Sequence, residues 1–113
     1  MGVFDKAKEL GEEIRTMEEY KELVRTSTNV QENSEATGII DDIQKLQQQI
    51  QFAQQSGVQP SPEQIQEFNN LKSKMDSNLT IQAYVKAQDD FNQVMQDVNR
   101  AISQEISPER KEE

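Results

Sequence analysis

The side chains in this sequence whose types and spacing could do chemistry are carboxylates, which occur as four adjacent pairs. The pairs are Glu12-Glu13, Glu18-Glu19, Asp41-Asp42 and Asp89-Asp90. Two carboxylates in one site can share a proton or hold a divalent cation. Neighbouring residues of a helix, however, do not face each other. The pairs therefore predict solvated helix faces, and a magnesium site of oxygen ligands assembled across helices is the alternative that the residue types leave open.

Cysteine and histidine are both absent from the 113 residues. Their absence excludes Ser-His-Asp and Cys-His catalysis, structural zinc sites, and the Glu-x-x-His pairs of di-iron helical bundles. The glycines are isolated, so no phosphate-binding loop is present; they are Gly2, Gly11, Gly38 and Gly57. We therefore expect a protein that is not an enzyme and that has no metal and no cofactor.

Composition restricts the partners and the location of the chain. Twelve basic residues are scattered among twenty-one acidic ones, with a net charge of −9, so direct nucleic-acid binding is not expected. No apolar run approaches the roughly 18–20 residues that span a bilayer, and no helix carries the basic face of a membrane-surface helix. The start "MGVFDKAKEL" lacks the apolar core of a signal peptide. With no thiols, we expect a soluble cytoplasmic protein.

Periodicity decides between helix and disorder, because only 33% of the residues are hydrophobic. In the glutamine-rich middle of the chain, apolar residues recur in steps of four and three, which predicts an amphipathic helix. This stripe consists of Ile39, Ile43, Leu46, Ile50 and Ala53. The glutamines lie mainly outside the stripe. There they favour helix formation and give the helix a solvated face without adding charge.

The predicted helix ends before "GVQPSP", because Gly57 can adopt a left-handed conformation and Pro60 cannot continue a helix. Ser61 is the expected N-cap of the next helix, with Pro62 at the first helical position and Gln64 completing a capping box. The following stripe is Ile65, Phe68, Leu71 and Met75. Two helices joined by a short connection most simply form an antiparallel hairpin.

The last segment has the most regular repeat, and it predicts a helix up to Ser107-Pro108. Its stripe is Tyr84, Ala87, Phe91, Val94, Val98 and Ala101, flanked by Ile81, Val85, Met95 and Ile102. Ser77, Asn78 and Thr80 either cap a new helix or mark a kink within one long arm. Whether residues 76–80 break the helix stays open at this point.

The N-terminal third predicts two shorter helices. Val3, Phe4, Ala7, Leu10 and Ile14 form the first stripe. Thr16 fits a capping box with Glu19 that starts the second helix, which carries Tyr20, Leu23, Val24 and Val30. The segment 33–38 is the expected joint before the hairpin. Without any strand pattern, we predict a single all-α domain, 1–113, with a helix pair at 1–32, a long hairpin at 33–107, its tip at 56–62 and a frayed tail at 108–113.

Self-association follows from the length of the last helix. A helix of about 26 residues is about 40 Å long, whereas a compact chain of this length has a radius of gyration of only about 13 Å. Part of its apolar stripe would face water in a monomer, so we expect a homodimer or a higher oligomer in which the stripes form a helical bundle. The expected contact residues are Ile43, Leu46, Ile50, Tyr84, Phe91, Val94 and Val98.

The layout resembles a family of small bacterial proteins. "MGVFDKAKELGEEI", "EEYKELV", "VQENSEATGIIDDIQKLQQQIQ" and "PEQIQEFNNLKSKMDSNLTIQAYVKAQDDFNQVMQDVNRAI" are similar to the YlbF/YmcA group (control of competence regulators), especially its YheA-like branch. The likeness covers about residues 2–107. The most family-like piece is a break followed by Tyr84, Ala87 and Asp89 and then a long apolar-periodic helix.

The resemblance implies an all-helical, oligomeric cytoplasmic adaptor that acts through other proteins of a regulatory complex. Some members modulate ribonuclease Y and carry cysteines associated with an iron–sulfur cluster; this chain has no cysteine, so that cofactor role does not carry over. The alternative interpretation is a small secreted or structural helical hairpin of the WXG type. The lack of tryptophan and of a Trp-x-Gly turn argues against it.

Overall fold

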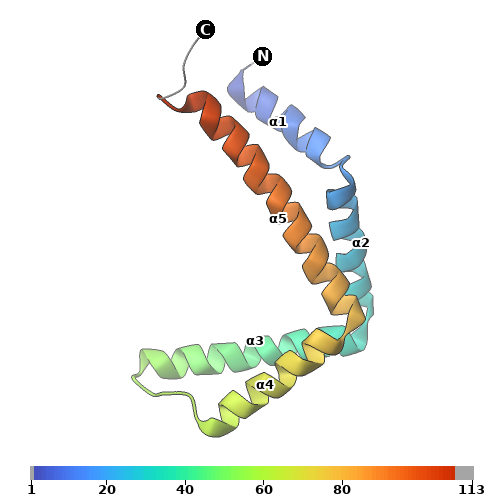
Figure 1. The fold of residues 1–113 in the computed structure, drawn as a ribbon. Helices are drawn as coiled ribbons and strands as arrows, with labels where there is room; N and C mark the ends of the chain where they lie inside the picture. Colours follow the sequence, from blue (N-terminus) through green and yellow to red (C-terminus); the bar gives the residue numbers. More distant parts are fainter. Residues whose placement is uncertain (1, 109–113) are drawn as a thin grey trace. The chain divides into compact units, whose positions relative to one another are not determined.

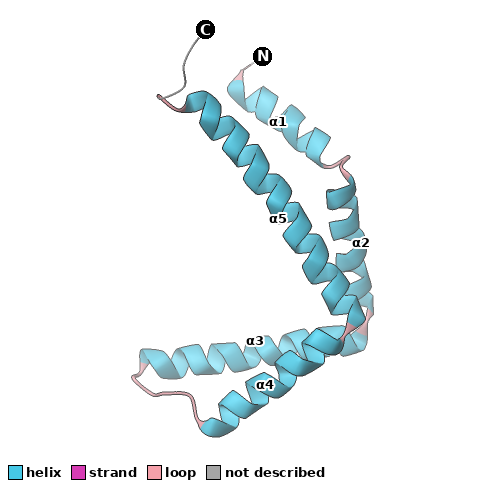
Figure 2. Ribbon diagram, viewed as in Figure 1, coloured by secondary structure: helices cyan, strands magenta, loops and turns pink. Residues whose placement is uncertain are grey.

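The structure, a computed structural model, describes residues 2–108, and this part of the chain is entirely helical apart from its connections (Figures 1 and 2). Its five helices are α1 (Val3–Ile14), α2 (Glu18–Glu32), α3 (Ser34–Gln55), α4 (Pro62–Ser77) and α5 (Leu79–Ile106). No strand occurs in the described range, which confirms the all-α class. Of the tail predicted at 108–113, all but Pro108 lies outside the described residues.

The chain divides into two compact units, and the boundaries between them fall inside α2 and α5. The hairpin unit is Thr26–Tyr84, which contains the end of α2, all of α3 and α4, and the start of α5. The terminal unit combines Met1–Arg25 with Val85–Glu113, and therefore contains α1, the start of α2 and most of α5. That the whole chain is one domain stays a prediction.

In the hairpin unit, α3 packs along α4 as the two stripes predict. Ile39, Ile43 and Leu46 are buried, and Ala36 extends the same stripe one step earlier. The complete buried set of this unit is Thr26, Val30, Ala36, Ile39, Ile43, Leu46, Leu71 and Ile81. The glutamines at 44, 47, 48, 49, 51, 54 and 55 are all exposed. The apolar stripe thus forms the core, and glutamine covers the outside.

The turn between α3 and α4 has the predicted chemistry. Gly57 has φ +81°, and the amide nitrogens of Gly57 and Val58 donate to the carbonyls of Gln54 and Ala53 at 3.0 and 2.8 Å. These two hydrogen bonds around a residue in the left-handed conformation form a Schellman motif, which satisfies the last carbonyls of a helix. The residues 56–61 that connect α3 and α4 are not helical, close to the predicted tip at 56–62.

The start of α4 is a complete capping box. Ser61 Oγ accepts a hydrogen bond from the Gln64 amide at 3.1 Å, and Gln64 Oε1 accepts one from the Ser61 amide at 3.0 Å. Pro62 occupies the first turn, where its missing amide hydrogen removes nothing from the helix. Two of the free amides of the helix start are therefore satisfied by side chains of the same short segment.

The structure settles the open question at residues 76–80 as a break at one residue. Asn78 has an extended conformation (φ −87°, ψ 109°) and ends α4. Its Oδ1 accepts a hydrogen bond from the Ile81 amide at 3.0 Å, so the same side chain caps the start of α5. Gln82 Nε2 donates back to the Met75 carbonyl at 3.0 Å and bridges the break.

Two sequence predictions about helix starts were wrong. The joint predicted at residues 33–38 is a single residue, Asn33, whose Oδ1 accepts from the Ala36 amide at 2.9 Å and starts α3 five residues early. Thr16 does not cap α2, which begins at Glu18. Instead, Thr16 Oγ1 donates to the Glu13 carbonyl at 2.6 Å, so its hydroxyl serves the end of α1. The sequence pattern assigns Thr16 to the following helix although its hydroxyl serves the preceding one, and it does not identify Asn33 as a cap, because a short polar side chain can bond locally on either side.

The terminal unit buries much less than the hairpin unit. Among its described residues only Ala87 is buried, with 2% of its surface exposed. α2 and α5 meet at Tyr20 and Phe91, whose rings are in contact. Within α1, every residue of which is described, no side chain is buried although the apolar residues follow a helical stripe. Several large apolar side chains of this unit are therefore exposed in a single chain.

Candidate interaction surface

The carboxylate pairs occupy helix surfaces, as the sequence predicts. Seven of the eight side chains are exposed, and Glu19 is half-buried. Among the residues that the structure describes, no three His, Cys, Asp or Glu side chains lie close enough together to hold a metal ion.

Among the described residues, the acidic group with a shifted pKa is Glu22, and an ion pair on α2 explains the shift. Arg25 donates to both carboxylate oxygens of Glu22 from one turn further along the helix. This hydrogen bonding lowers the pKa of Glu22, partial desolvation opposes the shift, and the charges of Arg25 and Lys86 add to it. The same pair raises the pKa of Arg25. Both side chains are more than one-third exposed, so this is a surface ion pair of small energetic value rather than a catalytic arrangement.

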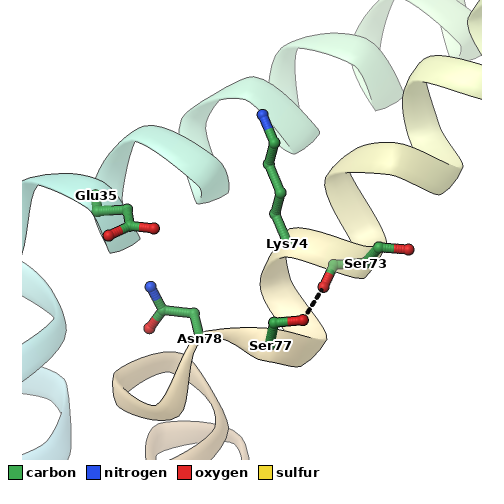
Figure 3. A pocket seen from close by; sticks show the side chains of 5 residues that line it. All are labelled: Glu35, Ser73, Lys74, Ser77 and Asn78. Atoms are coloured by element: carbon green, nitrogen blue, oxygen red, sulfur yellow. Dashed lines mark hydrogen bonds between the residues drawn. The ribbon is translucent and has the colours of Figure 1, made fainter.

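A polar hollow lies where α3 begins and α4 ends, and Figure 3 shows its lining. The side chains come from Glu35, Ser73, Lys74, Ser77 and Asn78. Ser77 Oγ donates to the Ser73 carbonyl at 2.9 Å, and the Asn78 side chain caps α5. In Figure 3 the Lys74 side chain extends away from Glu35. Because the serine and asparagine groups serve the backbone, the hollow is a consequence of the helix break and not a built binding site.

The residues expected to mediate self-association are divided between the two units. Ile43 and Leu46 are 8% and 3% exposed and lie in the core of the hairpin unit, where the chain's own helices cover them. Ile50 and Tyr84 belong to the same unit and are half-buried. Phe91, Val94 and Val98 lie on α5 in the terminal unit and are also half-buried. Their contact with a second copy stays a prediction.

The most exposed apolar side chains of the terminal unit were absent from that expected set. We call them the terminal surface: Val3, Phe4, Leu10, Val24, Ile102 and Ile106. Phe4 is 84% exposed and Val3 is 78% exposed. Ile102 and Ile106 could have been found from their spacing. They follow the stripe residue Val98 by four and eight residues, about one and two helical turns, and so continue its face of the helix. Periodicity marks an apolar face but does not tell which part of it the chain itself covers.

A known protein family matches this chain over nearly its whole length. The family model described as "Control of competence regulator ComK, YlbF/YmcA" matches residues 3–107, which include all five helices. This match covers more than half of the chain and therefore shows the family. The chain belongs to the YlbF/YmcA family, as the sequence resemblance predicts.

Individual relatives match over almost the same range. A UPF0342 protein of Streptococcus uberis is 30% identical over 100 residues, which cover 88% of this chain and 89% of that protein. UPF0342 proteins of Streptococcus pyogenes serotypes M5 and M49 are each 27% identical over 100 residues, 88% of both chains. Among the described residues, no helix is long and apolar enough to cross a membrane.

Proposed function

We propose that this protein is a non-enzymatic, self-associating adaptor that acts through protein–protein contacts in a bacterial regulatory or RNA-processing complex. Membership in a family of competence-control regulators supports a regulatory role. The absence of histidine and cysteine supports a role without catalysis by these groups. Within the family we place the chain in the YheA-like branch on its sequence likeness, and it lacks the cysteines that the cluster-associated members carry.

The observation that carries the proposal is α1. It has an apolar stripe, yet none of its residues is buried, and Phe4 remains 84% exposed. Full burial of one large apolar side chain is worth roughly 1.5–3 kcal/mol. The six side chains of the terminal surface are between 36% and 84% exposed, so covering them by a second copy gains only part of this value for each. The combined gain is still a large fraction of the stability of a small domain, roughly 5–15 kcal/mol.

A second copy is the simplest cover for this surface. Two identical apolar surfaces can pair around a two-fold axis, the commonest symmetry of soluble oligomers, and form a shared helical bundle. In this arrangement the half-buried Phe91, Val94 and Val98 on α5 extend the contact that α1 begins. A regulator built in this way offers its charged outer faces to further partners.

The adaptor role is tested by affinity purification of a tagged copy from its native cell. We expect an untagged copy and a reproducible set of intracellular proteins to co-purify with the wild type. Phe4→Asp should recover less of the untagged copy, whereas Phe52→Asp, at a similarly exposed position of α3, should recover as much as the wild type. Recovery of the protein mainly from the culture medium, with no untagged copy bound, would favour the WXG-type export protein instead.

A further inference from the structure

The hairpin unit has a second apolar surface, which is distinct from the terminal surface. α3 and α4 form a groove near their connection, lined by Gln47, Ile50, Gln51, Gln54 and Phe68. Ile50 and Phe68 form its half-buried apolar part, and the three glutamines are exposed. Ile65 precedes Phe68 by one helical turn on the same side of α4 and is 50% exposed. We call the five lining residues, Gln47, Ile50, Gln51, Gln54 and Phe68, the groove surface.

The groove surface carries no charge in a chain that is otherwise highly charged. Charged residues make up 29% of the sequence, and the net charge is −9. Between Leu46 and Pro62, however, there is no Asp, Glu, Lys or Arg. Two acidic chains repel each other wherever their carboxylates approach, and a charge buried without a partner is costly. The α3 side of the groove surface lies in this neutral segment, so two copies can bring it together without either cost.

The glutamines also identify the partner. A carboxamide both donates and accepts hydrogen bonds, so a row of glutamines can pair with an identical row. A row of carboxylates or ammonium groups cannot, and would require a partner of opposite charge. An apolar groove between glutamines is therefore self-complementary, which is the requirement of a two-fold contact in which the same patch meets itself.

We propose that the groove surface binds the groove surface of a second copy of this chain. Ile50 and Phe68 of the two copies meet at the centre, and Gln47, Gln51 and Gln54 pair around them. Because this contact is separate from the terminal surface, each chain has two self-contacts. The two contacts join each chain to two different copies, so that the assembly is larger than a dimer; this step rests on the proposed terminal contact.

The test is a pair of matched double variants on one helix. Gln47→Glu with Gln54→Glu places two carboxylates in the groove, and two more from the second copy. Gln48→Glu with Gln55→Glu changes the same number of charges at the same seven-residue spacing, at exposed positions that do not line the groove. Glutamate and glutamine have similar helix propensity, so both variants should keep the wild-type helix content by circular dichroism.

At one fixed micromolar concentration and low salt, light scattering should show that the groove variant has about half the wild-type mass, as expected when one of two symmetric contacts is lost. The control variant should keep the wild-type mass. Raising the salt to about 0.5 M should restore part of the lost mass, because like-charge repulsion is screened. An unchanged mass of the groove variant, or an equal loss in the control variant, overturns the proposal.

The terminal surface and the groove surface can be separated in the same experiment. If Phe4→Asp leaves the mass unchanged and the groove variant becomes a monomer, the groove contact stands and the proposed terminal contact fails. If only Phe4→Asp lowers the mass, the terminal contact stands and the groove inference fails. A groove variant that keeps its mass but loses a different protein partner from the cell shows that the groove serves that partner, which also overturns pairing between copies.

Discussion

The rings of Tyr20 and Phe91 lie with their centroids 5.8 Å apart and their planes inclined by 59°. Tilted aromatic pairs at this separation are favoured because the positive edge of one ring meets the negative face of the other. Tyr20 is on α2 and Phe91 is on α5, so the contact joins two helices of the terminal unit that are far apart in the sequence. It lies in a unit that has only one buried residue among those described.

A double-mutant cycle tests this contact. Tyr20→Ala and Phe91→Ala should each lower the free energy of unfolding, and the two effects should differ from additivity by about 0.5–1.5 kcal/mol. Urea melts at one protein concentration supply the measurement, since the stability of an oligomer depends on concentration. Phe52→Ala, on the exposed face of α3, should change the stability by less than about 0.5 kcal/mol. Strict additivity of the Tyr20 and Phe91 effects would show that the rings do not stabilise each other.

Two glycine substitutions should change the free energy of unfolding in opposite directions. Gly57 has φ +81° and no atom within 4 Å of an added Cβ, so Gly57→Ala introduces backbone strain without a clash and should destabilise by about 1 kcal/mol. Gly38 is inside α3 with equally open surroundings, and Gly38→Ala should stabilise by about 0.5–1 kcal/mol through helix propensity. Thermal or urea melts measure both. Two changes of the same sign would contradict this description of the turn.

Substitution of the helix caps Ser61 and Asn78 should change the stability in the same way at both positions. Ser61→Ala and Asn78→Ala each remove a side-chain acceptor from a helix start and should cost about 0.5–2 kcal/mol. Ser61→Asp and Asn78→Asp keep the acceptor and should be nearly neutral. Ser103→Ala, at an exposed position within α5, serves as the control and should have little effect. Alanine and aspartate variants of equal stability would mean that these side chains are not caps.

The sequence predicts the helices of this protein well because each has a local signal. Helix packing requires an apolar stripe, here Ile39, Ile43 and Leu46. Helix ends require residues that can stop or cap a helix, here Gly57 and Ser61. Starts at residues such as Thr16 and Asn33 are less predictable, since a short polar side chain can bond to either neighbouring helix. The exposure of α1 could not be predicted, because a stripe shows which face is apolar and not what covers it.

The Glu22–Arg25 pair predicts a specific pH response. Because the folded-state pKa of Glu22 lies below the ordinary glutamate value, the pair contributes its small stabilisation at neutral pH. That contribution is lost as the pH falls through the folded-state pKa. Arg25→Ala should raise the pKa of Glu22 measured by NMR titration of its carboxyl carbon, and Arg100→Ala should leave it unchanged. A Glu22 pKa that does not respond to loss of Arg25 would show that the pair does not persist in solution.

The apolar surface of α1 makes the assembly sensitive to one exposed residue. Phe4 is 84% exposed and Phe52 is 73% exposed in the single chain, so replacement of either by aspartate removes little internal packing. Phe4→Asp places a charge in the proposed terminal contact, where it would be buried without a partner. Phe52→Asp adds the same charge outside both proposed contacts and is therefore the matched control.

The measurement that tests the central claim most directly is the mass of these three proteins by light scattering at micromolar concentration. The wild type and Phe52→Asp should have at least twice the chain mass of 13.0 kDa, and Phe4→Asp should have a lower mass with unchanged helix content. A wild-type protein that is fully helical and stable at 13.0 kDa would contradict the claim that this chain works as a self-associating adaptor.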